Sequence, residues 1–290
     1  MSKELTMGSS VIETIPLQLT ADQAEAMAQR QIKKHHVAIV LLHWFNATTW
    51  IVEFATGAGL IVSPYYRFAP VWYLQMMEGL FGSRANMLRF HIAVGLTWIS
   101  VFLVYAIFGF RNYLRVEVLQ HEIALDDDDW RWLKIRLLRL FDGSRESLPP
   151  QGVYNAGQKL FALLVYLAIP VVMLTGLVMA FHWVGAAAVA WAMVLHFFAV
   201  GMVVSGLMIH VYMGAVFPEE KPAFYSMITG MVDELYAYRH HFKWWREVKL
   251  QEQSWRRQLT AQQDTPELPD SKGPAQAPTT TQSNMADEEV

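Results

Sequence analysis

Residues 186–210, AAAVAWAMVLHFFAVGMVVSGLMIH, decide the fold of this chain. They contain no Asp, Glu, Lys or Arg, and their two ionisable side chains are His196 and His210. About 20 apolar residues are enough for a helix to cross the hydrocarbon core of a bilayer. The stretch therefore predicts a membrane-spanning helix, which we place at residues 185–213.

Three other stretches have similar composition. Residues 160–181 contain no charged side chain and no histidine, while residues 37–62 and 90–110 are nearly as apolar and are interrupted by a few ionisable side chains. Each is long enough to span a bilayer. The sequence therefore predicts an all-α membrane protein built on a bundle of four transmembrane helices.

Composition excludes several classes of site. The chain of 290 residues has no cysteine, which rules out disulfides, iron–sulfur clusters and covalent c-type haem in this chain. Its formal net charge of −3 gives no reason to expect nucleic-acid binding. The N-terminal region lacks the pattern of a secretory signal, so we expect the first span itself to direct insertion.

The distribution of cations predicts the orientation of the four spans. All but three of the 23 Lys and Arg residues lie in the N-terminal segment, the loop between the second and third spans, and the C-terminal segment. The exceptions are Arg67, Arg84 and Arg89. Because cytoplasmic loops are enriched in Lys and Arg, both termini are expected in the cytoplasm.

The segments outside the spans suggest three regions. Residues 1–34 form a cytoplasmic extension, residues 35–250 the membrane domain, and residues 251–290 a Pro-, Gln- and Thr-rich tail that we expect to be disordered. Thr20 and Gln23 resemble a capping box that opens a short helix. Residues 130–141 mix Trp and Leu with cations, as does an interfacial amphipathic helix or a helix packed on a partner. The acidic run 126–129 is expected to be solvated.

Four of the ten histidines fall inside the predicted spans, at His43, His91, His196 and His210. An ionisable side chain in a membrane helix is costly unless it faces the bundle interior with a partner. In the predicted topology His43 and His210 lie near the cytoplasmic face, and His91 and His196 lie in the outer half. The four histidines thus form two pairs, one near each face.

The spacing on the fourth helix supports two stacked metal sites. The 14 residues from His196 to His210 give a rise of about 21 Å and a rotation roughly 40° short of four turns, so both imidazoles project from one face. Two axial imidazoles hold a haem without adding charge and leave no open coordination position. We therefore predict two b haems, with His91 and His196 on the outer one and His43 and His210 on the inner one. The alternative is four core histidines that hydrogen-bond to neighbouring helices.

Glycines in or near the spans offer smooth surfaces on which a macrocycle could lie: Gly57, Gly59, Gly95, Gly176, Gly201 and Gly206. Close helix–helix packing is the other interpretation of these residues. The histidines flanking the spans, His35, His36, His240 and His241, are expected at the membrane interface.

Several motifs resemble the cytochrome b (gamma) subunit of respiratory formate dehydrogenases, over roughly residues 34–249. They are His43-Trp-Phe, Arg89-Phe-His-Ile-Ala-Val-Gly95, Tyr154-Asn-Ala-Gly-Gln-Lys159, the two histidines of the fourth span with Ile209-His-Val-Tyr-Met213, and His240-His-Phe-Lys-Trp-Trp-Arg-Glu-Val248. The third motif and the fourteen-residue histidine spacing are the most specific.

The resemblance implies a fold, cofactors and partners. It implies a multi-pass protein of a bacterial inner membrane that takes electrons from an iron–sulfur (beta) subunit and passes them through two b haems to menaquinone or ubiquinone. Formate oxidation would lie on a molybdenum- or tungsten-containing catalytic (alpha) subunit, and a higher oligomer of the complex stays open. Asn155, Gly157 and Gln158, with His210 nearby, match the quinone pocket of the family.

Two residues retain alternative interpretations. Asn155 is also a good N-cap for the third helix, and cap and pocket can coexist. Glu53 lies deep in the first span, where an apolar residue is expected. It is either a proton-relay carboxylate or, as we favour, a protonated acid that is hydrogen-bonded inside the bundle.

The chain is therefore expected to be an electron-transfer subunit of a formate dehydrogenase complex. One rival keeps the haems but replaces the donor by a hydrogenase or another molybdoenzyme. A rival of another class is a haem-free anchor or proton-relay transporter, which would have no need of two histidine pairs at opposite faces.

Overall fold

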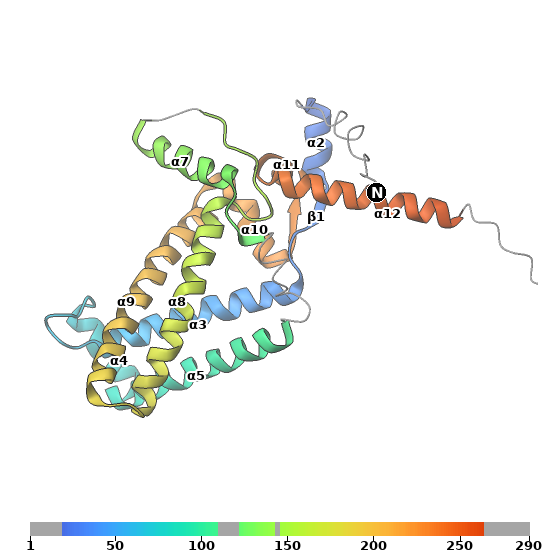
Figure 1. The fold of residues 1–290 in the computed structure, drawn as a ribbon. Coiled ribbons are helices and arrows are strands. Elements are labelled where there is room, and N and C mark those ends of the chain that lie inside the picture. Colours follow the sequence, from blue (N-terminus) through green and yellow to red (C-terminus); the bar gives the residue numbers. More distant parts are fainter. Residues whose placement is uncertain (1–18, 110–121, 143–145, 264–290) are drawn as a thin grey trace, which may run out of the picture. The chain divides into compact units, whose positions relative to one another are not determined.

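Four long helices dominate the computed structural model, which describes residues 19–109, 122–142 and 146–263. They are α3 (Val37–Leu60), α5 (Arg84–Gly109), α8 (Ala156–Phe181) and α9 (Ala186–Val211) (Figure 1). All four are long and apolar enough to cross a membrane. The predicted all-α architecture with four spans is confirmed.

Two of the four helices begin earlier than their apolar runs. Helix α5 begins at Arg84 rather than at residue 90, and α8 begins at Ala156 rather than at residue 160. Hydropathy marks only the part of a helix that contacts hydrocarbon, whereas the hydrogen-bonded helix continues into polar residues at its ends. A π-helical turn, η1 (Tyr212–Val216), follows α9.

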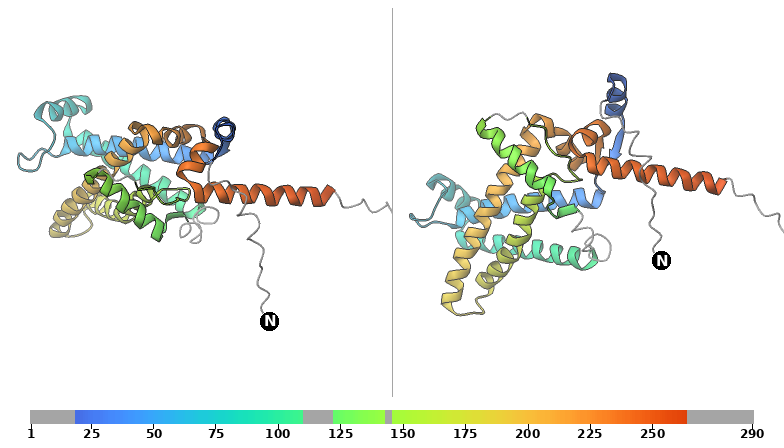
Figure 2. Two further views of the ribbon diagram at one scale, coloured as in Figure 1. Left: turned by 90° about the horizontal axis from the view of Figure 1, so that it is seen from above. Right: turned by 45° about the horizontal axis from the view of Figure 1, so that its top comes forward.

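The spans associate as two hairpins. Helix α3 packs on α5 and α8 packs on α9, as Figures 1 and 2 show from several directions. Between α3 and α5 the chain forms the short helix α4 (Val71–Phe81), which ends at Gly82 in the left-handed conformation (φ 73°). The two hairpins touch where α5 meets α8.

The segments that precede the first span and follow the last span pack together outside the spans, and we call this unit the cap. It comprises α2 (Ala21–Gln29), β1 (Gln31–Lys33), the 3₁₀ turn η2 (Pro218–Glu220), α10 (Lys221–Thr229), β2 (Met231–Asp233), α11 (Glu234–His240) and the start of α12 (Phe242–Gln263). Strands β1 and β2 pair antiparallel, with Ile32 opposite Val232. The predicted capping box at Thr20 is present, with Thr20 and Gln23 each accepting a backbone N–H of the other.

The cap has its own hydrophobic core, which the sequence did not predict. Its buried members are Met27, Ile32, Val232, Tyr236, Ala237 and Trp245. The N-terminal extension is therefore packed against the segment that follows the last span. Beyond the cap, residues 251–263 of the expected tail continue α12, and residues 264–290 lie outside the described residues.

Helix α7 (Asp127–Asp142) corresponds to the amphipathic segment predicted at residues 130–141. Trp132 and Ile135 are buried, whereas Trp130 and Leu137 are exposed. Its packing against α8 positions the first turn of that span.

Candidate functional site

Helices α3 and α9 bring His43 and His210 together. Their ring centroids are 6.4 Å apart and the rings are tilted by 55°. Two imidazoles on opposite sides of one metal ion, with bonds of about 2 Å, place their ring centres roughly 6 Å apart. Nδ1 of His43 is buried without a partner among the described residues, and the ring of His210 stacks on Phe161 at 5.0 Å. This pair fits the axial ligands of one haem.

His91 and His196 each contact a threonine on the other helix of their hairpin. Nδ1 of His91 on α5 lies 2.8 Å from the hydroxyl of Thr56 on α3, and that hydroxyl donates to Val52 O. Nδ1 of His196 on α9 lies 3.0 Å from the hydroxyl of Thr175 on α8. When Nδ1 carries the proton and donates it in this way, Nε2 has a lone pair for a metal.

A glycine follows each of these threonines and lets the histidine ring lie close. A Cβ added at Gly57 would lie 3.5 Å from Cε1 of His91, and one added at Gly176 would lie 3.5 Å from Cε1 of His196. The two hairpins therefore repeat one arrangement, a Thr-Gly pair on the first helix holding a histidine on the second. The signal for this arrangement in the sequence is the repeated dipeptide Thr56-Gly57 and Thr175-Gly176.

Nδ1 of each of these two histidines has a second partner besides the threonine hydroxyl, and this partner differs between them. His196 Nδ1 also lies 3.1 Å from the backbone oxygen of Val172. His91 Nδ1 instead lies 2.7 Å from Oε2 of Glu53, and both side chains are about one-fifth exposed. Glu53 thus faces the bundle interior beside a histidine.

The remaining glycines have mixed surroundings. Added Cβ atoms at Gly59 and Gly206 would come within 2.9 Å of Met87 and 2.8 Å of Phe161, respectively, so these two glycines serve close packing. An added Cβ at Gly95 would meet Oε1 of Glu53 at 3.7 Å, and at Gly201 nothing lies within 4 Å. Packing thus accounts for Gly59 and Gly206, as in the alternative interpretation.

The chemistry of the donor set matches a haem better than a bare metal ion. Among the described residues, no group of three or more His, Asp or Glu side chains could hold a metal ion. Two imidazoles per site suffice for a haem iron, because the porphyrin supplies the other four ligands.

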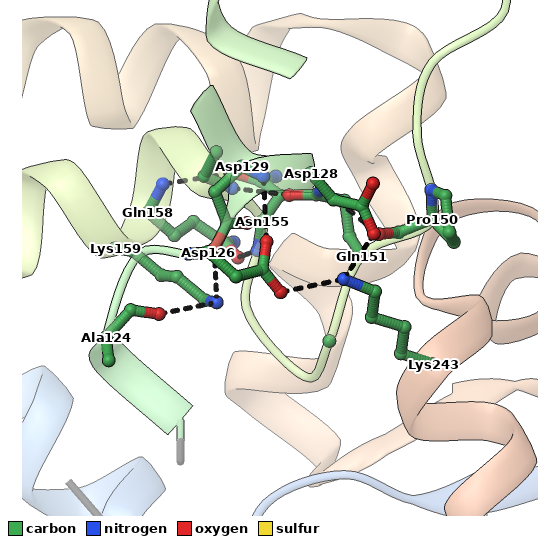
Figure 3. Close-up of polar contacts among 12 residues, drawn as sticks. Ala124, Asp126, Asp128, Asp129, Pro150, Gln151, Asn155, Gln158, Lys159 and Lys243 are labelled. Atoms are coloured by element: carbon green, nitrogen blue, oxygen red, sulfur yellow. Dashed lines mark hydrogen bonds and ion pairs between the residues drawn. The ribbon is translucent and has the colours of Figure 1, made fainter. Parts of the chain in front are cut away.

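The predicted quinone residues lie at the first turn of α8, where they form a capping box (Figure 3). Oδ1 of Asn155 accepts the N–H of Gln158 at 3.0 Å, and Oε1 of Gln158 accepts the N–H of Asn155 at 3.0 Å. An added Cβ at Gly157 would lie 3.7 Å from the indole of Trp132, so an aromatic ring already covers this glycine. The N-cap role of Asn155 is thus present in the structure.

A buried ion pair next to this turn corrects one expectation. Asp129, from the acidic run that we expected to be solvated, is 1% exposed, and its Oδ2 accepts a hydrogen bond from Lys159 Nζ at 2.7 Å. Asp126 and Asp128 are more exposed and pair with Lys243, each at 2.7 Å (Figure 3). Although partial burial opposes the change, hydrogen bonding from Lys243 lowers the pKa of Asp126. The acidic run fastens the starts of α7, α8 and α12 to one another.

Asn155 also lines a cavity of about 600 Å³. Its walls include Trp132, Arg136, Gln151, Glu220 and His240. Gly157, Gln158 and His210 do not line this cavity, so the structure does not gather the four predicted quinone residues around it. Among the described residues, the side-chain N–H₂ of Asn155 has no hydrogen-bond acceptor.

Two histidines expected at the interface are buried instead. His241 is 1% exposed and His35 is 5% exposed. Nδ1 of His241 lies 2.7 Å from Gly152 O, and its Nε2 lies 3.2 Å from Nζ of Lys34. Burial and the nearby Lys34 lower the pKa of His241 to about 3, and burial lowers the pKa of Lys34 to about 8.

Glu220 is a buried acid near these groups. Its Oε2 accepts a hydrogen bond from Tyr236 at 2.5 Å, and Oε1 lies 3.6 Å from Nδ1 of His240. Burial alone would raise the pKa of Glu220, but the nearby His240 and the hydrogen bond from Tyr236 lower it to about 2.

The chain is similar in sequence to several known proteins. It is 22% identical to a formate dehydrogenase cytochrome b556 subunit of Haemophilus influenzae over 224 residues, which cover 76% of the chain and 84% of the relative. It is 25% identical to the cytochrome b556(fdo) subunit of Escherichia coli formate dehydrogenase over 71% of the chain and 88% of the relative. The nitrate-inducible cytochrome b556(Fdn) subunit of the same organism is 27% identical over 51% of the chain and 67% of the relative.

The predicted resemblance to cytochrome b subunits of formate dehydrogenases is therefore confirmed at the level of sequence similarity. The sequence profile of one family, described as prokaryotic cytochrome b561, matches residues 34–230 and so covers all four spans. With four apolar helices that match this profile, the chain belongs to the prokaryotic cytochrome b561 family and is a multi-pass bacterial membrane protein that binds haem b.

Proposed function

We propose that this chain is the membrane cytochrome b subunit of a formate dehydrogenase complex, which passes electrons from an iron–sulfur subunit through two b haems to a quinone. The observation that carries the proposal is the arrangement on α9. One helix bears His196 and His210, and the ring of His210 lies 6.4 Å from that of His43 on another helix. His91 is the proposed partner of His196. The names of the relatives supply the complex.

In this proposal the four histidines hold two haems. His43 and His210 would hold the inner haem, and His91 and His196 would hold the outer haem. Each haem supplies one-electron oxidation and reduction. Thr56 and Thr175 orient the outer rings by engaging Nδ1, and the apolar spans exclude water from the site.

The proposed orientation follows from charge and from the cap. Strands β1 and β2 precede the first span and follow the last, and their pairing agrees with an even number of crossings. Since most Lys and Arg residues lie on that side, we assign it to the cytoplasm. Moving one electron inward against a potential of 100 mV requires about 2.3 kcal/mol.

The quinone is proposed to bind at the cytoplasmic end of α8. Asn155 lines the cavity there, and its free amide N–H₂ is a suitable donor to a quinone carbonyl. Gln158 and Gly157 support this position by capping the helix and by accepting the close approach of Trp132.

Haem quantitation on the purified complex tests the proposal. We expect two b haems per copy of this chain, reduced by formate and reoxidised by a menaquinone analogue. His196→Ala should remove one haem, whereas His182→Asn, a change at an exposed histidine in the left-handed conformation, should retain both. Asn is chosen because it tolerates that conformation.

Other outcomes would decide against the proposal. A chain without b-haem absorbance would favour the haem-free anchor or transporter. If the chain copurifies with a hydrogenase catalytic subunit and formate does not reduce its haems, the chain still transfers electrons through two haems but receives them from a hydrogenase.

A further inference from the structure

Glu53 has a position that the haem ligands alone do not explain. It lies in the middle of α3, an apolar helix in which no other Asp, Glu, Lys or Arg occurs. A carboxylate is costly at such a depth unless a specific partner stabilises it. Oε2 lies 2.7 Å from Nδ1 of His91, which is within hydrogen-bonding distance.

Two groups lie next to this carboxyl group. Gly95 on α5 is one of them, and even an added Cβ there would make an ordinary contact, 3.7 Å from Oε1 of Glu53. Thr56, one turn along α3, directs its hydroxyl oxygen to the same Nδ1 at 2.8 Å. Two oxygens from one helix therefore converge on Nδ1 of His91, which would leave Nε2 to hold a haem iron.

The other three histidines have no such partner. Nδ1 of His196 meets a hydroxyl and a backbone carbonyl, both neutral. Nδ1 of His43 is buried without a partner among the described residues, and His210 stacks on a phenyl ring. Of the four proposed ligands, only His91 contacts a carboxyl group within the part of the chain that the structure describes. We take this group as ionised, in place of the protonated acid favoured from the sequence.

We propose that Glu53 is a positioning residue that lowers the reduction potential of the outer haem relative to the inner haem, and so biases electrons inward. The inference rests on the proposed function, because it takes His91 as an axial ligand. A carboxylate on the far nitrogen of a ligating histidine makes the imidazole a stronger donor. Its negative charge also stabilises the oxidised, more positive state of the site.

The direction of the effect suits the proposed path. An electron that arrives at the outer haem passes more readily to a second haem of higher potential. The inner ligands His43 and His210 lack a carboxylate partner, so the inner site is the one expected to hold the electron. Glu53 thereby helps an electron move inward against the membrane potential.

Redox titration of the whole complex, followed by α-band absorbance and by electron paramagnetic resonance, tests this inference. Glu53→Gln keeps a side chain of similar size and an oxygen acceptor but removes the charge. We expect it to retain two haems and to shift the outer haem by at least tenfold toward its reduced form, which is about 59 mV for one electron. The reduction potential of the inner haem should not change.

Glu78→Gln is the matched control. Glu78 lies in α4, the short helix between α3 and α5, and pairs with exposed Arg84 instead of a histidine. It should leave both potentials unchanged. If Glu53→Gln fails to assemble, Glu53→Val, which suits an apolar helix, should give a shift of the same sign.

Three results would overturn the role of Glu53. One is an unchanged outer potential in a variant that retains both haems. The second is a shift confined to the inner haem. The third is loss of the outer haem from both variants, which would make Glu53 a requirement for haem retention and not a tuning group. Failure of the proposed function is distinct, since the wild-type complex would then lack two haems or fail to reduce quinone.

Discussion

The side chain of Asn155 has two ends with different surroundings. Its oxygen caps α8 by accepting the N–H of Gln158, while its N–H₂ has no acceptor among the described residues. Because the residue also lines the 600 Å³ cavity, one side chain can serve both the helix and a ligand. Substitutions that preserve only one end can separate the two roles.

Asn155→Ser preserves the cap, since Ser is as good an N-cap residue as Asn, but removes the amide donor. We expect thermal stability close to wild type and a KM for the quinone analogue about tenfold higher, as loss of one hydrogen bond of roughly 1.4 kcal/mol implies. Asn155→Ala should lose both, with about 1 kcal/mol of stability. Steady-state kinetics and thermal unfolding of the purified complex measure the two effects. An unchanged KM in Asn155→Ser would leave Asn155 with the cap alone.

Residue types in the spans were informative only where they are unusual there. Histidines and Glu53 could be recognised from the sequence because ionisable groups are rare in membrane helices. Thr56 and Thr175 could not, since a threonine in a helix commonly bonds its own backbone four residues earlier, as Thr97 does to Ala93. Their contact with histidines depends on how two helices pack, which periodicity does not give.

Helix α9 packs on α8 through small residues. Ala192, Ala199 and Val203 are buried, and an added Cβ at Gly206 would come within 2.8 Å of Phe161. Phe161 in turn stacks on His210. The packing of the two helices and the setting of the inner histidine are therefore coupled through one ring.

Gly206→Ala should disturb that coupling. The added methyl must displace Phe161 or Leu164, and overpacking of this kind destabilises by about 1–3 kcal/mol. We expect a lower thermal midpoint and an altered absorbance of the inner haem. Gly201→Ala, on the same helix with nothing within 4 Å, is the matched control and should be neutral or slightly stabilising, because Ala favours helix over Gly. Equal effects of the two variants would argue against the role of Phe161.

At this scale the existence of the helices was predictable and their surroundings were not. Hydropathy located the four spans, and the fourteen-residue spacing of His196 and His210 predicted that both lie on one face of their helix. The cap was missed because β1 and β2 are three residues each and lie 200 residues apart in the chain, so no local pattern announces their pairing.

The cap ties together segments that are distant in the sequence. His241 bridges the loop before α8 and the residue before the first span, through Gly152 and Lys34. Gly230, with φ of 76°, lets its own carbonyl accept the N–H groups of Lys34 and His35, and a Cβ there would lie 2.8 Å from His35 O. The first and last spans are thus joined at their polar ends, and the contact between Nζ of Lys34 and Nε2 of His241 requires His241 to be neutral.

Acid should therefore loosen the cap. In the unfolded chain His241 takes up a proton below about pH 6.5, whereas in the folded chain its pKa is about 3, so between these values the unfolded state binds the extra proton. The contribution of His241 to the free energy of unfolding is therefore fully present above about pH 6.5 and decreases as the pH falls. At pH 5 the loss from His241 is about 2 kcal/mol. Glu220, with a folded pKa of about 2, adds a further loss below about pH 4.5.

Thermal unfolding in detergent, followed by tryptophan fluorescence at pH 7 and pH 5, measures this loss. We expect the midpoint of the wild-type protein to drop by several degrees, as a change of about 2 kcal/mol implies. His241→Asn should be less stable at pH 7, because it loses the contact with Lys34, but its midpoint should change less between the two pH values. His36→Asn keeps an N-cap at an exposed position of α3 and should follow the wild-type slope. A slope in His241→Asn as steep as that of the wild type would mean that acid acts on the protein through a different group.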